Sequence, residues 1–208
     1  MRLTPLPTSF PATVAALHRV AEDIVAPARK PDNEIALYPT PGGFGTPVFE
    51  YGGVRRRVRV EGDELVSEHR VALRSLEAAR GLVGDLVPEP VSEDPLSIDS
   101  AAATVIGEWY AFAHEVLSAF AAAEARLWPE HFDLAIELDE VNYGFSPGDE
   151  QHAEPYAYVG PWSAEVAGAL WNATGFRGAE LTYAELAAGE DPRAAALEFM
   201  TTRKEALR

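Results

Sequence analysis

The chain of 208 residues contains no cysteine. Disulfide bonds, thiol catalysis and cysteine-ligated zinc or iron–sulfur centres are therefore excluded, and such a composition is typical of a reducing compartment. The chain also lacks an apolar run of the roughly 18 residues that a transmembrane helix requires. Its first residues, MRLTPLPTSFPATVAAL, lack the basic flank and the cleavage site of a signal peptide. We therefore expect a cytoplasmic protein with no membrane association.

Positive charge is scarce in the second half of the chain. Residues 1–96 carry 11 Lys and Arg against 14 Asp and Glu, whereas residues 97–208 carry 6 against 19. Most of the net charge of −16 therefore lies after residue 96. A surface this acidic repels phosphate backbones and anionic lipids, so we expect neither nucleic acid nor a membrane as a partner.

One basic segment, VRRRVRVEG, interrupts this pattern in the first half. If it forms a strand, Arg55, Arg57 and Arg59 lie on one face, because successive side chains of a strand alternate. Runs of charge usually form solvated faces that pair with neighbouring acids, and we expect that role here. A patch that binds a small anion is the alternative.

The hydrophobic content of 47% is sufficient for an ordinary globular core. The length fits one large domain or two small ones. Three prolines and three acids crowd the segment VPEPVSEDPLS, which is typical of a linker or a long surface crossing. We predict a single α+β domain over residues 1–208, with two candidate sub-halves, 1–87 and 97–208, joined by a crossing at 88–96.

Apolar residues at helical spacing predict five helices. Their expected starts carry residues that cap helices or occupy the first turn, namely Ser or Thr before Pro11, and an Asp–Pro pair near the C-terminus. The longest shows a continuous apolar stripe. The predicted helices cover residues 9–25, 75–86, 98–126, 163–171 and 191 to the end of the chain.

Alternating patterns and turn residues predict two groups of strands. The tight turns at Gly52-Gly53, Gly62-Asp63 and Asp139-Glu140 indicate antiparallel pairing. Helices and strands follow the same order in both halves, which suggests a pseudo-twofold duplication of a helix–strands–helix unit. The predicted fold class is α+β, with antiparallel sheet and flanking helices. The predicted strands cover residues 34–38, 44–51, 54–61, 64–71, 131–138, 141–145 and 156–159.

Four segments carry a family resemblance: WPEHFDLA, GFSPGDEQHAEPYAYVGPW, LTYAEL and DPRAAALEFMTTRKEAL. Together they resemble an uncharacterised, chiefly actinobacterial family that has a domain of unknown function with an FDLA strand, a GFxPGD turn and a PYxY strand. The chain departs from this pattern in being shorter and in its short spacer between FDLA and the turn. The resemblance implies a fold, and it implies no activity, substrate or cofactor.

The segment from Trp128 to Trp162 is rich in aromatic and acidic residues and contains no Lys or Arg. On a strand, His131 and Asp133 would share one face. The same alternation points Tyr156 and Tyr158 to one side of another strand. A neighbouring strand carries Asn142. These five residues are our candidate ligand-binding residues, lining a pocket over the sheet.

Alternatives for this segment involve packing, metal binding or catalysis. The aromatic residues can instead pack in the core with their hydroxyl groups at the rim. Asp133 or Glu137 is a candidate general base and His131 a candidate acid or base, whereas Ser146 is a poor nucleophile because Pro follows it. The potential metal ligands match no compact spacing, so we predict neither a metal nor a cofactor. Those ligands are Glu130, His131, Asp133, Asp149, Glu150 and His152.

Two functions remain open on the sequence alone. The first is a small-molecule-binding domain, with or without enzymatic activity, whose pocket lies over the sheet. The second is a structural or protein-interaction domain that forms a homodimer through an exposed strand or the long helix. A concave pocket lined by the five candidate residues favours the first, and a flat or fully packed arrangement favours the second.

Overall fold

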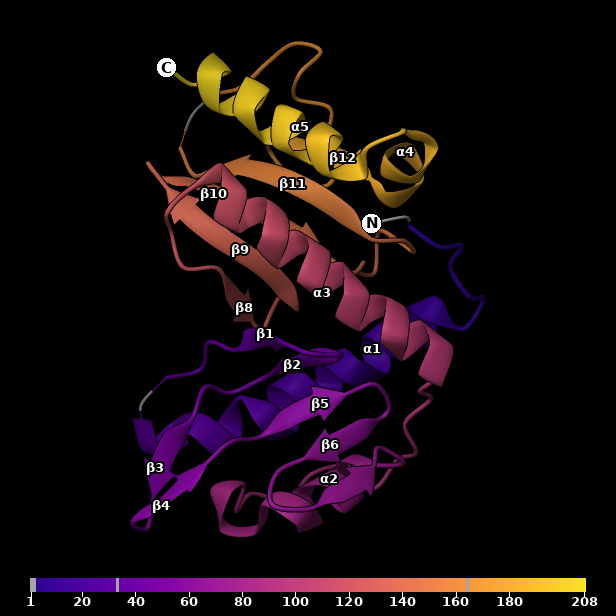
Figure 1. Cartoon of the computed structure of the whole chain (residues 1–208), viewed down its shortest axis with the longest axis vertical. Helices are drawn as coiled ribbons and strands as arrows, with labels where there is room; N and C mark the ends of the chain where they lie inside the picture. Colours follow the sequence, from indigo (N-terminus) through magenta and orange to yellow (C-terminus); the bar gives the residue numbers. More distant parts are fainter. Residues whose placement is uncertain (1–2, 33, 164) are drawn as a thin grey trace.

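The structure is a computed structural model that describes residues 3–32, 34–163 and 165–208 (Figure 1). Over these residues the chain forms five α-helices, two five-stranded antiparallel sheets and a two-stranded ribbon. The predicted α+β class with antiparallel sheet is therefore confirmed. None of the described helices has both the length and the apolar character needed to cross a bilayer.

The first helical segment begins after Ser9 as predicted, but the Ser9 side chain makes no capping hydrogen bond. The segment continues through three types of helix. Helix α1 (Phe10–Val20) is followed without a break by a π-helical turn, η1 (Ala21–Val25), and then by a 3-10 turn, η2 (Pro27–Asp32). Pro27 cannot continue an α-helix because it has no N–H to donate. The apolar side of α1 and η1 is buried.

The first sheet has the order β1-β2-β5-β6-β7. All its strands have three residues: β1 (Tyr38–Thr40), β2 (Gly43–Gly45), β5 (Arg59–Glu61), β6 (Glu64–Val66) and β7 (Arg70–Ala72). Between β2 and β5 the chain leaves this sheet as the ribbon β3 (Phe49–Tyr51) and β4 (Val54–Arg56). The ribbon turns at Gly52 and Gly53, whose φ angles of 60° and 75° favour glycine, as predicted for this hairpin.

Three predicted strands of the first half are wrong in extent because each is broken into two. The strands predicted at 44–51 and 54–61 both break where Thr46 contacts Val58. There the Thr46 N–H donates to Val58 O at 2.8 Å, and the Val58 N–H donates to the Thr46 hydroxyl at 3.0 Å. Pro47 follows and has no N–H for a ladder, so the chain departs from the sheet. The strand predicted at 64–71 breaks at residues 67–69, and the one predicted at 34–38 begins only at Tyr38.

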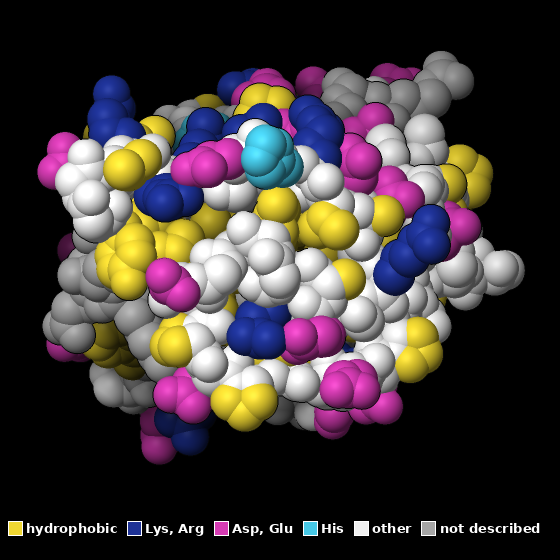
Figure 2. Space-filling model, turned by 90° about the horizontal axis from the view of Figure 1, so that it is seen from below, with side chains coloured by type: hydrophobic (Ala, Val, Ile, Leu, Met, Phe, Trp, Pro, Cys, Tyr) yellow, Lys and Arg dark blue, Asp and Glu magenta, His cyan; other side chains and the backbone are white. Residues whose placement is uncertain are grey.

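The arginine run does not form the continuous strand face that was predicted, because it spans the break between β4 and β5. Its expected pairing with acids is found at two positions. Arg56 contacts Glu68 at 2.6 Å, and Arg59 contacts Glu61 at 2.6 Å. At the end of the molecule formed by the first sheet and α2, basic and acidic side chains lie next to one another (Figure 2).

Helix α2 (Leu76–Val83) and the 3-10 turn η3 (Gly84–Leu86) match the predicted helix. The Ser75 hydroxyl accepts a hydrogen bond from the Ala78 N–H at 3.2 Å, as an N-cap does. The segment 88–96 then leads to α3 (Ser100–Phe120), which is about 30 Å long at ~1.5 Å per residue. This helix was predicted to reach residue 126. It ends earlier because residues 126–128 pair in a sheet.

The second sheet has the order β12-β11-β10-β9-β8 and is built on three longer strands. Its hairpin between β9 and β10 turns at Asp139 and Glu140, with φ angles of 55° and 61°, where the turn was predicted. The short outer strands β8 and β12 were not predicted. The five strands are β8 (Arg126–Trp128), β9 (Asp133–Leu138), β10 (Val141–Ser146), β11 (Tyr156–Pro161) and β12 (Ala179–Thr182).

The helix predicted at 163–171 is wrong, since the described residues of this segment form a loop. Gly168 has a φ of 96°, which interrupts a helix. The chain then forms β12 and α4 (Tyr183–Ala188), which begins with a capping box of Thr182 and Glu185. Helix α5 (Pro192–Ala206) was predicted, and the Asp191 carboxylate accepts from the Ala194 N–H at 3.0 Å.

The two sheets meet at one β-bridge. Leu37 and Leu127 exchange two backbone hydrogen bonds of 2.8 Å, which join the β1 edge of the first sheet to the β8 edge of the second. Helix α3 packs against strands of both sheets (Figure 1). In the second sheet, Phe145 and Tyr143 of β10 are buried and contact α3. The ring centroids of Trp109 in α3 and Phe145 are 5.4 Å apart. The opposite face of this sheet is free of helices α3 and α5.

Candidate functional site

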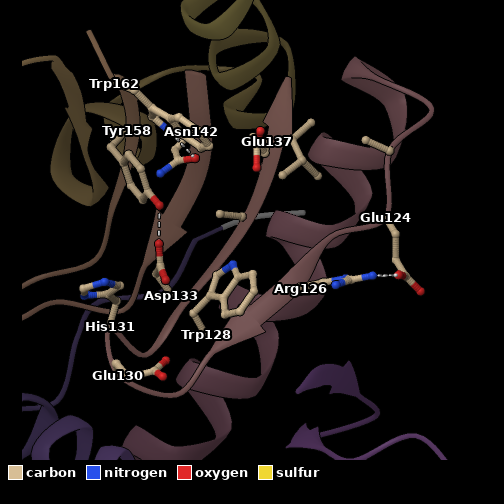
Figure 3. A pocket seen from close by; sticks show the side chains of 13 residues that line it. Glu124, Arg126, Trp128, Glu130, His131, Asp133, Glu137, Asn142, Tyr158 and Trp162 are labelled. Atoms are coloured by element: carbon tan, nitrogen blue, oxygen red, sulfur yellow. Dashed lines mark hydrogen bonds and ion pairs between the residues drawn. The ribbon is translucent and has the colours of Figure 1, made fainter. Parts of the chain in front are cut away.

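The open face of the second sheet contains two adjoining hollows of about 720 and 550 Å³. Strand alternation directs side chains of β9, β10 and β11 to this face, because the intervening residues are buried on the side of α3. The two hollows share part of their lining, and we call them together the sheet cavity. Figure 3 shows the larger one. The shared lining residues are Glu130, His131, Asp133, Asn142, Tyr158 and Trp162.

All five candidate residues line the smaller hollow, and all except Tyr156 also line the larger one. Asp133 is the first residue of β9, Asn142 lies on β10, and the two tyrosines lie on β11. His131 does not lie on a strand, contrary to the prediction. It is part of the turn at 129–132, where Phe132 adopts a positive φ of 52°. Its imidazole reaches the cavity from this turn (Figure 3).

The floor of the cavity depends on a glycine. Gly144 of β10 lies directly opposite Tyr158 of β11 in the antiparallel register. A Cβ atom at Gly144 would lie only 2.5 Å from the Tyr158 ring. The ring therefore lies across Gly144, and its hydroxyl donates a hydrogen bond to the Asp133 carboxylate (Figure 3). A larger residue at position 144 would separate this pair.

Asp133 is a buried carboxylate with only part of its hydrogen-bonding capacity used. Its residue is 6% exposed, and its Oδ2 accepts from Tyr158. Its Oδ1 has no hydrogen-bond partner within the described chain. Burial raises the pKa of Asp133 above its ordinary value, against the opposing effects of the Tyr158 hydrogen bond and of nearby His131. A buried polar atom without a partner typically costs about 1–3 kcal/mol.

Two exposed tryptophans line the cavity. Trp128 of β8 is paired with Asp133 in the register and is 37% exposed. Trp162, just after β11, is 55% exposed, and its indole N–H donates to the Asn142 side-chain oxygen at 3.1 Å. In Figure 3, Trp128 lies beside Asp133, and Trp162 lies beside Asn142 and Tyr158. Indole rings at these positions give the cavity aromatic walls.

A second polar cluster supports one rim. His152 contacts Asp149 through Nδ1 at 3.0 Å and Glu180 through Nε2 at 3.1 Å. Tyr156 donates to Asp149 at 2.7 Å. Burial would raise the pKa of Asp149, but the hydrogen bonds from Tyr156, the Gln151 backbone and His152 together lower it. These contacts tie the loop after β10 to strand β12.

Three residues of the smaller hollow come from α1 and from the loop before β12, outside the segment Trp128 to Trp162. His18 of α1 stacks on Phe132, with ring centroids 5.3 Å apart and planes 7° from parallel, and it lines the smaller hollow. Phe176 and Arg177 belong to the loop before β12, and the Phe176 ring packs edge-on against Tyr158 at 6.0 Å. No local signal in the sequence links α1 or this loop to β11, so only the tertiary arrangement brings them together.

Acidic side chains dominate the charge of the cavity. The lining contains five carboxylates and two arginines. One of the arginines, Arg126, is paired with Glu124 at 3.2 Å. The carboxylates are Glu124, Glu130, Asp133, Glu137 and Asp149, and the arginines are Arg126 and Arg177. A negatively charged cavity attracts positively charged groups and repels anions.

The potential metal ligands of the sequence do not gather into one site. Over the residues that the structure describes, no group of three or more His, Asp or Glu side chains is arranged to hold a metal ion. His152 instead makes its contacts with Asp149 and Glu180. Ser146 is buried, and its hydroxyl accepts from the Gly148 N–H at 3.1 Å. The chemistry that the cavity does offer is a carboxylate acceptor surrounded by aromatic rings.

Comparisons of the chain with models of protein families, with curated proteins and with solved structures find no match.

Proposed function

We propose that this protein binds a small molecule in the sheet cavity. The observation that carries the proposal is Asp133, a buried carboxylate that lines a cavity of ligand size and has one oxygen without a hydrogen-bond partner among the described residues. Small-molecule sites are typically clefts of ~300–1,000 Å³ with aromatic walls and a few directed polar groups. The sheet cavity has both features. Asp133 and Tyr158 are the polar groups that orient a ligand, and Trp128 and Trp162 are the surfaces against which it packs.

A thermal-shift screen against metabolites tests this proposal. A ligand that binds only the folded state raises the apparent melting temperature. Gly160→Leu is the matched blocking variant. Gly160 follows Tyr158 on the same face of β11, and a Cβ there would meet only the Tyr158 ring at 4.0 Å, so the leucine side chain enters the cavity without a backbone clash. We expect compounds that shift the parent protein to leave Gly160→Leu unshifted.

The control variant is Gly81→Leu on α2, where the added side chain meets open space remote from the cavity. This variant should respond to each compound as the parent protein does. If a broad screen shifts neither the parent nor Gly81→Leu, the proposal is overturned. If compounds shift the parent and Gly160→Leu equally, binding takes place elsewhere and the sheet cavity is not the site.

The alternative is a protein-interaction domain that forms a homodimer through the same face. The large exposed fractions of Trp128 and Trp162 favour this reading, because exposed aromatic residues are enriched in protein interfaces. The edge of β12 is less suited to a dimer interface. The Asn172 side chain exchanges two hydrogen bonds of 3.0 Å with the Glu180 backbone and so occupies the edge of β12. Sedimentation of the parent and of Trp162→Ser distinguishes the two, since only a dimer would dissociate in the variant.

A further inference from the structure

We infer that the ligand of the sheet cavity is an organic cation, specifically a protonated amine attached to an aromatic or apolar body. This inference rests on the proposed function and adds the chemical class of the ligand. It starts from Asp133, whose carboxylate lines both hollows and whose buried Oδ1 has no donor within the described residues. An ammonium group carries only donors and a full positive charge, so it suits such a carboxylate at a cavity wall in both respects.

The second step is the aromatic surroundings of that oxygen. Tyr158 holds the other carboxylate oxygen, and the Trp128 side chain lies beside Asp133 on the neighbouring strand (Figure 3). Trp162 lies next to Tyr158 on the far side of the cavity (Figure 3). Faces of tryptophan and tyrosine rings attract cations, and the attraction increases when the cation is partly removed from water. The same rings pack against the apolar body of an amine.

The third step is the surrounding charge. The other lining carboxylates add to the negative potential, while Arg126 is already paired with Glu124. Arg177 is the other lining arginine, and it is an exposed residue of the loop before β12. The basic side chain near Asp133 is His131, and no ion pair joins Asp133 to a Lys or Arg within the described residues. An anionic ligand would have to approach this buried carboxylate among further acids, whereas an ammonium group adds the positive charge that a neutral ligand lacks.

The fourth step separates an amine from a metal cation. Hard metal ions in proteins require several oxygen ligands at once. Within the described residues no such cluster of acidic or histidine side chains exists, and Asp133 is a single carboxylate bordered by rings. One carboxylate with aromatic walls suits a single ammonium group. The volume of about 550 Å³ leaves room for the body that carries it.

The test uses three probes of nearly equal shape and different charge: 2-phenylethylamine, 2-phenylethanol and phenylacetate. Binding is followed by NMR through the indole N–H signals of the tryptophans in the 15N-labelled protein, with Trp128→Phe and Trp162→Phe to assign the two cavity signals. We expect 2-phenylethylamine to shift these two signals and to bind at least tenfold more tightly than 2-phenylethanol. Phenylacetate should leave both signals unchanged.

Asp133→Asn supplies the decisive variant, because it removes the charge while keeping an oxygen that can accept from Tyr158. Its affinity for 2-phenylethylamine should fall at least tenfold, to that of 2-phenylethanol for the parent protein. Asp85→Asn is the matched control, since it makes the same change at an exposed residue of η3 outside the cavity lining, and it should change the affinity by less than threefold. The indole and amide spectra of each variant show that it remains folded.

The outcomes separate this inference from the proposed function. If 2-phenylethanol or phenylacetate shifts the cavity signals as strongly as the amine, the cavity binds small molecules and the cationic class is wrong. The cationic class is also wrong if no probe shifts the cavity signals but the metabolite screen yields compounds that stabilise the parent protein and not Gly160→Leu. If neither experiment detects binding, both proposals are overturned. An undiminished affinity in Asp133→Asn overturns the role of the carboxylate.

Discussion

The two sheets of this protein place their acidic side chains in different surroundings. In the first sheet, Glu61 contacts Arg59 at 2.6 Å and Arg70 at 2.7 Å, and Arg70 also contacts Glu64 at 3.0 Å. In the second sheet, Asp133 is buried beside tyrosine and tryptophan, and its only described side-chain hydrogen bond comes from Tyr158. Glu61 and Glu64 of the first sheet are paired with neighbouring arginines on short strands, whereas Asp133 of the second sheet makes no ion pair within the described residues.

If the sheet cavity binds a ligand as proposed, this difference separates charges that serve the fold from a charge that serves the ligand. Exposed ion pairs contribute little stability and can be exchanged at little cost. A buried carboxylate with a free oxygen lowers stability, and chains retain such groups mainly at functional sites. The first sheet therefore has the charge pattern of a scaffold, and the buried carboxylate of the second sheet supports the proposed binding site. Four substitutions test this contrast, in order of decreasing expected effect.

Gly107→Ala should have the largest effect, because it alters the helix that both sheets share. A Cβ at Gly107 of α3 would lie 2.6 Å from the Gly42 backbone in the β1–β2 turn. Backbone atoms cannot rotate away, so we expect a loss of about 3 kcal/mol in the free energy of unfolding. Urea denaturation measures it. Gly81→Ala in the exposed part of α2 meets no atom within 4 Å and should instead gain up to ~1 kcal/mol, as alanine does in a helix.

Tyr158→Phe should follow, with a loss of about 2 kcal/mol at pH 7, because it removes a hydrogen bond to a charged acceptor. The loss should become smaller under acidic conditions in which Asp133 is neutral. Tyr183→Phe is the matched control, since Tyr183 donates to the uncharged Thr4 carbonyl at 2.7 Å. Its effect should not vary over the same acidic range. Equal pH dependence of the two variants would contradict the charged state assigned to Asp133.

Asp133→Asn should have a smaller and opposite effect. Burial raises the pKa of Asp133 in the folded protein. An acid whose pKa is higher in the folded than in the unfolded protein contributes to stability when the pH is below its unfolded-state pKa of ~3.9. This contribution is lost as the pH rises through the pKa of the folded state. The variant should therefore exceed the parent in unfolding free energy by about 1 kcal/mol at pH 7.

The gain of Asp133→Asn should disappear as the pH falls toward ~4, where the aspartic acid becomes neutral as well. Denaturation curves at several pH values provide the measurement. A variant that is less stable than the parent at pH 7 would show that Asp133 stabilises the sheet. The contrast between the two sheets would then fail on its main example.

Arg59→Gln should have the smallest effect, because its ion pair with Glu61 lies on the partly exposed face of the first sheet. Glu61 keeps Arg70 as a partner, so we expect a loss of about 0.5 kcal/mol or less. High salt should reduce this loss further, since surface pairs are screened. A loss comparable to that of Tyr158→Phe would show that charges of the first sheet are as important for stability as those of the second.

Local signals in the sequence predicted those parts of the fold that depend on neighbouring residues. Ser75 and Asp191 cap the helices expected from them, and the Gly52-Gly53 and Asp139-Glu140 turns lie where their residue types indicated. Each of these features is settled by hydrogen bonds within a few residues. The apolar stripe of α3 was likewise sufficient to predict a long buried helix.

The errors occur where distant segments compete for the same residues. The helix predicted at 98–126 extends too far, because Arg126 begins β8, which pairs with β9 and, through Leu127, with Leu37. The error at 163–171 has a local cause instead: the described residues of this segment form a loop, and the φ of 96° at Gly168 interrupts a helix. Strand pairing satisfies the backbone of a whole segment and so overrides weak helical propensity.

The sequence by itself determined the α+β class, the main turns and caps, and the alternation that directs Asp133 and the two tyrosines to one side of their strands. Only the tertiary structure decided that these side chains surround a cavity. The bridge between Leu37 and Leu127 brings the two sheets together, and His18 joins the cavity from α1. The absence of a Cβ at Gly144 lets Tyr158 reach Asp133. The burial and free oxygen of Asp133 follow from those long-range contacts, which local residue patterns do not encode.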